Sequence, residues 1–257
     1  MSLILLKLVL PPFLILSASL AGRRWGDAIG GWLVGLPLTS GPVAAFLAVQ
    51  YGAEFAAIAT DGSLVGTAAQ GCFSLAYALL ARQGWIIALS GGTTAYAASG
   101  FLFQLLPLPH WGFFLLALVT LTASAHLIPH RTVSPSTIAA PWWDLPGRML
   151  IATLIVVTLT AAAALVGAKT AGILASFPVF GTVLAIFAHR ISGASAASQV
   201  LRGMVLALYG FATFFFVLGL CLTTFGFAAF VLAIASTLLV QVAALRFIRR
   251  GQTLKTA

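Results

Sequence analysis

Charged residues are scarce in this chain, and acidic residues are the scarcest of them. Only 7% of the 257 residues are charged, with four Asp and Glu against 13 Lys and Arg, whereas 61% are apolar. A soluble domain carries about 25% charged residues. So little charge excludes a water-facing surface over most of the chain, and it indicates that lipid covers most of the outside.

Cysteine is also rare. Cys72 and Cys221 both lie in apolar stretches, where small packing residues are expected rather than a disulfide framework. His126 and His130 have the spacing of a helical metal pair, but Pro129 lies between them and no carboxylate or thiol is close in sequence. We therefore expect neither a metal site nor a cofactor.

The apolar stretches have the length of membrane-spanning helices. The ten-residue alternation of a membrane β-barrel is absent, so helices of ~20 mainly apolar residues are the expected crossings. The predicted fold class is an all-α integral membrane protein. Nine spans are predicted, at residues 4–21, 28–50, 63–82, 85–106, 112–128, 149–167, 170–189, 199–222 and 224–247.

Basic residues predict the orientation of these spans. With the N-terminus outside, every Lys and Arg except Lys7 and Lys169 falls on the cytoplasmic side, which predicts an N-out, C-in topology. Arg23 and Arg24 follow the first apolar run instead of preceding it, so we expect a retained helix and not a cleaved signal peptide. Because the basic residues are scattered singly, the net charge of +9 indicates topology rather than nucleic-acid binding.

An internal repeat relates the two halves. Residues 7–88 align without a gap with residues 148–229, at a shift of 141 positions, and the informative matches are Gly26 with Gly167, Gly31 with Gly172, Gly52 with Gly193, Gly62 with Gly203, and Pro37 with Pro178. The predicted organisation is a first repeat at 1–111, a linker helix and loop at 112–141, and a second repeat with a basic cytoplasmic tail at 142–257. The single linker crossing inverts the second four-helix copy relative to the first.

The second predicted helix of each copy is interrupted by glycine and proline, over residues 35–42 and 176–182. Unwound backbone at membrane depth is tolerated where it is buried or lines a cavity, and paired interruptions indicate a transporter's binding site. The alternative is a pair of ordinary proline kinks. The residues predicted to line a substrate pathway are Pro37, Thr39, Ser40, Gly41, Pro42, Pro178, Gly181 and Thr182.

The second half also resembles a known family. The stretch from Ala171 to Phe180, followed by His189, Gly193, Arg202-Gly203-Met204 and Tyr209, is similar to the GlpM family of small bacterial inner-membrane proteins. Those proteins have a single four-helix unit, so the resemblance implies a duplicated, double-length form in the cytoplasmic membrane. It covers about 60 residues and implies no catalytic residue, but it does imply a loose association with exopolysaccharide output.

Four polar residues are candidates for the mouths of a pathway. Glu54 and Asp61 are seven residues apart, so they share a helix face near the predicted outer surface. His189 and Arg202 lie near the predicted inner surface. The alternatives are simple solvation for the two acids and helix capping for His189.

The predicted function is that of a transporter or flippase for a small polar, anionic or amphiphilic substrate, working by alternating access between inverted repeats. The alternative is a non-catalytic accessory or scaffold protein of an envelope or exopolysaccharide assembly complex. An enzyme is disfavoured, because the sequence has no Gly-x-Ser-x-Gly, no His-Glu-x-x-His and no phosphate-cradling loop. The expected partners are the lipid bilayer and a small-molecule or lipid-linked substrate, without nucleic acid, and a homo-oligomer stays open.

Overall fold

The computed structural model describes residues 2–37, 40–129, 143–163, 173–174 and 176–253, and all regular structure among them is helical. The predicted all-α class is thereby confirmed for the described part of the chain. The elements are α1 (Ser2–Trp25), α2 (Asp27–Val34), α3 (Ser40–Tyr51), α4 (Ala53–Leu80), η1 (Ala81–Gln83), α5 (Trp85–Gln104), α6 (His110–Leu127), α7 (Asp144–Ala163), α9 (Val179–Ser192), α10 (Ala194–Phe225) and α11 (Ala228–Thr253).

Several of these helices have the length and apolar composition of membrane-spanning helices. Five stretches of the described residues are long and apolar enough to cross a membrane: Ala53–Gln83, Trp85–Gln104, His110–Leu127, Ala194–Phe225 and Ala228–Arg246. Large apolar side chains project from their outer surfaces, among them Leu239, which is 76% exposed. Because a soluble protein rarely exposes such extended apolar surface, these features indicate a helical membrane protein.

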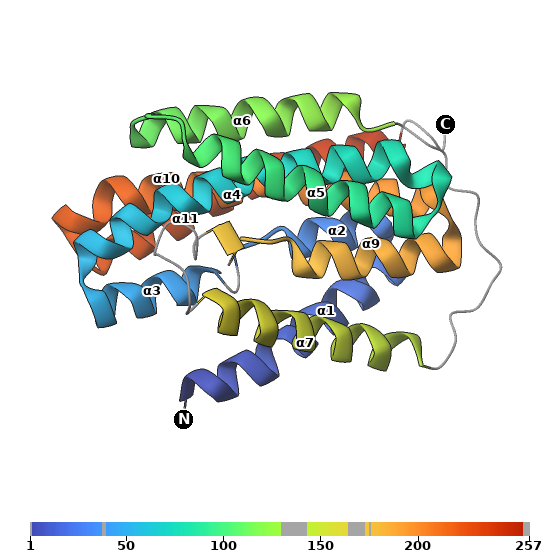
Figure 1. Ribbon diagram of the computed structural model, residues 1–257, viewed down its shortest axis with the longest axis horizontal. Helices are drawn as coiled ribbons and strands as arrows, with labels where there is room; N and C mark the ends of the chain where they lie inside the picture. Colours follow the sequence, from blue (N-terminus) through green and yellow to red (C-terminus); the bar gives the residue numbers. More distant parts are fainter. Residues whose placement is uncertain (1, 38–39, 130–142, 164–172, 175, 254–257) are drawn as a thin grey trace.

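The helices α4 and α10 form the centre of the fold (Figure 1). Both are mostly buried, whereas α5, α6 and α11 are mostly exposed. The helix α10 contacts α2, α4, α6, α9 and α11. In Figure 1, α6 lies along one long side of the molecule, and α1 and α7 lie along the opposite side. Elements from both ends of the chain therefore meet on α10.

Glycine allows α2 and α10 to touch backbone to backbone. A Cβ added at Gly31 would lie 1.9 Å from the Val200 carbonyl oxygen, and one added at Gly203 would lie 1.8 Å from the Ala28 carbonyl oxygen. Small residues at such crossings let membrane helices approach closely, and van der Waals packing then holds them together. The α2–α10 contact therefore depends on two residues without side chains.

Two further glycines set the direction in which α4 and α10 begin. Gly52 precedes α4 with φ 89° and ψ 162°, and Gly193 precedes α10 with φ 85° and ψ −178°. These backbone angles belong to a region that is essentially restricted to glycine. The two turns are thus alike, and they stand 141 positions apart in the sequence.

Each of the nine predicted spans overlaps a helix of the described residues, but some boundaries differ. The helix α4 begins at Ala53, well before the predicted start at 63, and α10 begins at Ala194 rather than at 199. The predicted spans began where the apolar run begins, whereas the helices also include the more polar residues just before it. The number of membrane crossings, the repeat and the orientation stay predictions.

Candidate functional site

The first predicted interruption is a break between α2 and α3. Helix α2 ends at Val34, and Gly35 to Pro37 form a turn before α3 begins at Ser40. Gly35 is buried against α10, because a Cβ there would lie 2.6 Å from Ala207 Cβ and 2.8 Å from the Met204 carbonyl oxygen. The break therefore lies directly on the central helix.

The second predicted interruption is a break just before α9. Residues 176–178 are non-helical, and the buried Pro178 is the N-cap of α9 without a side-chain hydrogen bond. Ser176 packs on Gly66 of α4, where an added Cβ would lie 2.4 Å from Ser176 Cβ. The second break therefore lies on the other central helix.

Aromatic residues of α4 and α5 hold the second break in place. The Tyr96 hydroxyl donates a hydrogen bond to the Ile173 carbonyl. The Phe177 ring meets the rings of Phe73 and Tyr96 edge to face, at centroid distances of 6.0 and 5.2 Å. Pairs of this geometry stabilise a packed core, so the backbone at the second break has a defined position.

Met204 contacts both breaks. Its carbonyl oxygen faces Gly35, and a Cβ added at Gly181, in the first turn of α9, would lie 2.1 Å from its Sδ. Both breaks lie near the middle of the molecule (Figure 1). The backbone of Met204 therefore meets the first break, and its side chain meets the first turn of the helix that follows the second break.

Two buried polar atoms near the breaks have no hydrogen-bond partner among the residues that the structure describes. They are the hydroxyl oxygen of Thr182, whose side chain is 3% exposed, and Nε1 of Trp32 on α2. An unsatisfied buried polar group costs about 1–3 kcal/mol. Each of these atoms therefore favours a bound water or polar ligand beside it.

The other pathway candidates have different surroundings. Ser40 is half-buried at the start of α3, and Gly41 is buried with the Phe214 ring 3.4 Å from an added Cβ. Pro42 lies in α3, but its side chain is outside the described part, and Thr39 is outside it altogether. Whether these residues contact a substrate stays a prediction.

Of the two acids in α4, only Asp61 has an ionic partner in the described structure. Its Oδ1 lies 2.6 Å from Nδ1 of His110, while His110 Nε2 lies 3.0 Å from the Phe216 carbonyl oxygen. Because both ring nitrogens face acceptors, the doubly protonated imidazolium satisfies both contacts. Glu54 is exposed in the first turn of α4. Sequence reasoning missed His110, which is 49 residues from Asp61.

His189 of α9 contacts α4. It lies in the last turn of α9, where its carbonyl accepts a hydrogen bond of 2.9 Å from the Gly193 amide. Its Nδ1 lies 3.3 Å from the Tyr77 hydroxyl oxygen, and the two rings meet edge to face. The side chain thus joins two helices at the end of α9.

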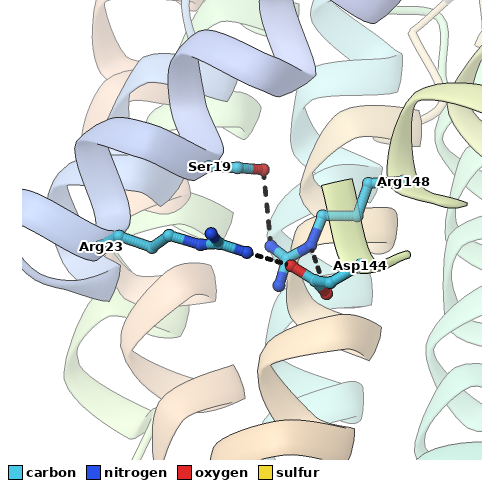
Figure 2. Close-up of polar contacts among 4 residues, drawn as sticks. All are labelled: Ser19, Arg23, Asp144 and Arg148. Carbon is cyan, nitrogen blue, oxygen red and sulfur yellow. Dashed lines mark hydrogen bonds and ion pairs between the residues drawn. The ribbon is translucent and has the colours of Figure 1, made fainter. Parts of the chain in front are cut away.

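A buried ion-pair cluster joins α1 to α7, and sequence reasoning did not find it. Figure 2 shows the guanidinium groups of Arg23, from α1, and Arg148, from α7, meeting the two carboxylate oxygens of Asp144, at 2.6 and 3.0 Å. Asp144 is fully buried, and Arg148 also donates to the Ser19 hydroxyl at 3.5 Å. Arg148 is likewise buried in this cluster.

The same cluster influences a nearby acid. Asp27 is the first residue of α2 and lies outside the five candidate spans. Burial raises the pKa of the Asp27 carboxyl above its ordinary value, and the Arg148 guanidinium acts in the opposite direction. The positive cluster therefore helps to keep a partly buried carboxylate charged.

Arg202 lies apart from the two breaks, beside a cavity of about 420 Å³ between α6, α10 and α11. Its Nη1 atom is buried and has no hydrogen-bond partner in the described structure. None of the residues lining this cavity belongs to either break. The unsatisfied Arg202 atom is thus separate from those near the breaks, and among the described residues Oε1 of Gln241 on α11 is a further buried atom without a hydrogen-bond partner.

Metal binding has no support in the described part of the chain, where no three His, Cys, Asp or Glu side chains gather.

No protein-family model, curated protein or solved structure matches this chain. The resemblance to the GlpM family therefore stays a prediction, and function has to be argued from the fold and the sites.

Proposed function

We propose that this protein is a transporter that moves a small polar or anionic substrate, or an amphiphile with such a head group, by alternating access between two inverted repeats. The observation that carries the proposal is that two interrupted helices both pack on α10 at Met204, and that the Thr182 hydroxyl and the Trp32 indole near the interruptions have no hydrogen-bond partner among the described residues. Discontinuous helices at a repeat interface are the usual binding sites of such transporters.

Exchanged contacts support the inverted repeat. Gly35 of the first half packs on Ala207 of the second, and Ser176 of the second half packs on Gly66 of the first. At the shift of 141 positions, Gly35 corresponds to Ser176 and Gly66 to Ala207. Two-fold related units exchange contacts in this way, with residue i touching j and j touching i. The similar turns at Gly52 and Gly193 point the same way.

The topology is part of the proposal. We take α2 and α3 as one interrupted crossing, and the segment through Pro178 with α9 as its counterpart, which gives nine crossings with α6 as the linker. The N-terminus is outside and the C-terminus is inside. A location in the cytoplasmic membrane and a distant relation to the GlpM family follow the sequence resemblance.

The chemistry at the breaks favours a hydrogen-bond acceptor as the transported group. The Trp32 indole only donates, and a threonine hydroxyl donates or accepts. The N-terminus of α9 has no side-chain cap, and helix N-termini attract anions. A carboxylate, a phosphate or a carbonyl group is therefore the expected chemistry at this site.

Both breaks are tightly packed: a Cβ added at Gly35 or Gly66 would collide with Ala207 or Ser176, and one added at Gly181 would displace the Met204 side chain. The same packing favours the second candidate function, a static scaffold within an envelope-assembly complex. The two candidates differ in whether the breaks open to water.

Site-directed cysteine labelling separates them without knowledge of the substrate. The native Cys72 and Cys221 are replaced by alanine, and single cysteines are introduced as Ser40→Cys and Thr182→Cys. A membrane-impermeant maleimide is then applied to right-side-out and to inside-out vesicles. Alternating access predicts labelling of both positions from both sides, whereas a scaffold predicts labelling from neither.

Two exposed positions calibrate the labelling. Glu54→Cys, at the predicted outer surface, should react only in right-side-out vesicles, and Arg82→Cys, at the predicted inner surface, only in inside-out vesicles. The reverse pattern contradicts the proposed orientation. Protected cysteines at both breaks, with correct labelling of the two exposed controls, contradict transport through this site.

A further inference from the structure

A groove between α6, α10 and α11 is the clearest site that the proposed transport does not use. Arg202, Leu206 and Tyr209 of α10 lie beside His126 of α6, and Val240 and Ala243 of α11 also line the groove. Its volume of about 420 Å³ falls within the range of small-molecule sites, which is about 300–1,000 Å³.

Arg202 carries a positive charge in this groove that no acidic side chain of the described residues neutralises. Its Nη1 is buried without a hydrogen-bond partner in the described structure, and no acidic side chain lines the groove. The four acids of the sequence lie elsewhere: Asp27 at the start of α2, Glu54 in the first turn of α4, Asp61 beside His110, and Asp144 between Arg23 and Arg148. An unpaired guanidinium in partly buried surroundings favours an anion from outside the chain.

The rest of the groove is suited to hydrocarbon. Leu206, Val240 and Ala243 are apolar, and the Tyr209 hydroxyl is already 2.8 Å from the Thr122 hydroxyl of α6. Arg202 lies two helical turns from Tyr209 along α10, so the charge is at one end and an apolar surface extends from it. The walls α6 and α11 are mostly exposed candidate spans, which places the groove beside lipid.

We propose that this groove binds an anionic phospholipid, with the phosphate on Arg202 and an acyl chain along Leu206, Val240 and Ala243. Basic pockets between membrane helices on the cytoplasmic side recognise anionic head groups, and Arg202 lies near the predicted cytoplasmic face. The groove shares no lining residue with the two breaks, so a failure of transport through the breaks leaves it untouched, and only the cytoplasmic placement of Arg202 rests on the proposed topology.

The test is a titration of the delipidated protein, purified in neutral detergent, with phosphatidylglycerol. The readouts are the apparent Tm and the number of lipids retained in native mass spectra. A ligand that binds only the folded state raises the Tm as its concentration exceeds Kd. We expect a saturable rise in Tm, and Arg202→Gln should weaken the apparent affinity by about ten- to a hundredfold, the range for losing a hydrogen bond to a charged group.

Two further variants keep the test interpretable if Arg202→Gln folds poorly. Ala243→Phe fills the groove from an exposed position of α11 and leaves Arg202 unchanged, and it should also abolish the shift. Arg82→Gln removes an exposed arginine that does not line the groove, so it should titrate like the native protein.

Three results would overturn the proposal. The first is an equal Tm shift with phosphatidylcholine, which has no net charge. The second is an equal, Arg202-dependent shift with inorganic phosphate alone, because it would identify a site for a free anion. The third is native-like lipid retention in both Arg202→Gln and Ala243→Phe.

Discussion

Replacing Asp144 by asparagine should destabilise the protein strongly. The carboxylate is fully buried and meets Arg148, whose side chain is 9% exposed, and Arg23, whose side chain is 43% exposed. Asparagine keeps the size of the side chain but removes its charge. Breaking a buried ion pair by removing one partner costs about 3–5 kcal/mol, because it leaves an uncompensated buried charge.

Most of this cost arises from Arg148. The half-exposed Arg23 can turn to water, and surface ion pairs contribute only about 0–1 kcal/mol. Arg148 is held between Asp144, Ser19 and the Phe187 ring, which lies 5.0 Å from its guanidinium carbon. We therefore expect Asp144→Asn to lower the free energy of unfolding by about 3–5 kcal/mol, and Arg23→Gln by less than about 1 kcal/mol.

A double-mutant cycle tests the reasoning directly. Asp144→Asn combined with Arg148→Met removes both buried charges, so the double variant should recover at least half of the stability that Asp144→Asn loses. Coupling energies between contacting residues reach about 0.5–3 kcal/mol. Unfolding is followed by tryptophan fluorescence during SDS titration of the protein in mixed micelles. The reasoning is refuted if the double variant is no more stable than Asp144→Asn, or if Asp144→Asn is within about 1 kcal/mol of the native protein.

Three other variants should give measurable changes in the same unfolding assay. Thr182→Val removes a hydroxyl that has no hydrogen-bond partner in the described part of the chain, so stability should stay equal or rise by about 1 kcal/mol, and a loss would contradict this assignment. Thr237→Val breaks a buried hydrogen bond and should cost about 1 kcal/mol. His110→Phe should lower the stability by about 1–2 kcal/mol, because it leaves Asp61 without its ionic partner. Adding Asp61→Asn to this variant should restore part of the lost stability. Gly203→Ala should cost about 1–3 kcal/mol or more by forcing α2 from α10, and a native-like value would show that these helices are not in backbone contact.

Sequence reasoning found the helices and the two breaks because both depend on local signals. Apolar runs located the spans, and the Pro37 and Pro178 regions located the interruptions that separate α2 from α3 and precede α9. These features follow from hydrophobicity and from the missing amide of proline, which act within a few residues of the chain.

The ionic contacts could not be found in this way. Asp144 pairs with Arg23 across 121 sequence positions, and Asp61 pairs with His110 across 49. With four acids and 13 basic residues, many pairings are compatible with the sequence, and only the packing of α1 on α7 and of α4 on α6 selects among them. The Arg202 groove has the same origin, since it needs three helices to form.

The turns at Gly52 and Gly193 limit which amino-acid substitutions these two positions tolerate. A single-base change in a glycine codon can introduce only residues that carry a Cβ, and backbone angles near φ 89° with ψ 162° exclude all of these, including the asparagine and aspartate that enter the ordinary left-handed region. Every missense allele at either codon therefore strains the start of a central helix. The two glycines should be retained even in lineages where the lipid-facing residues drift freely.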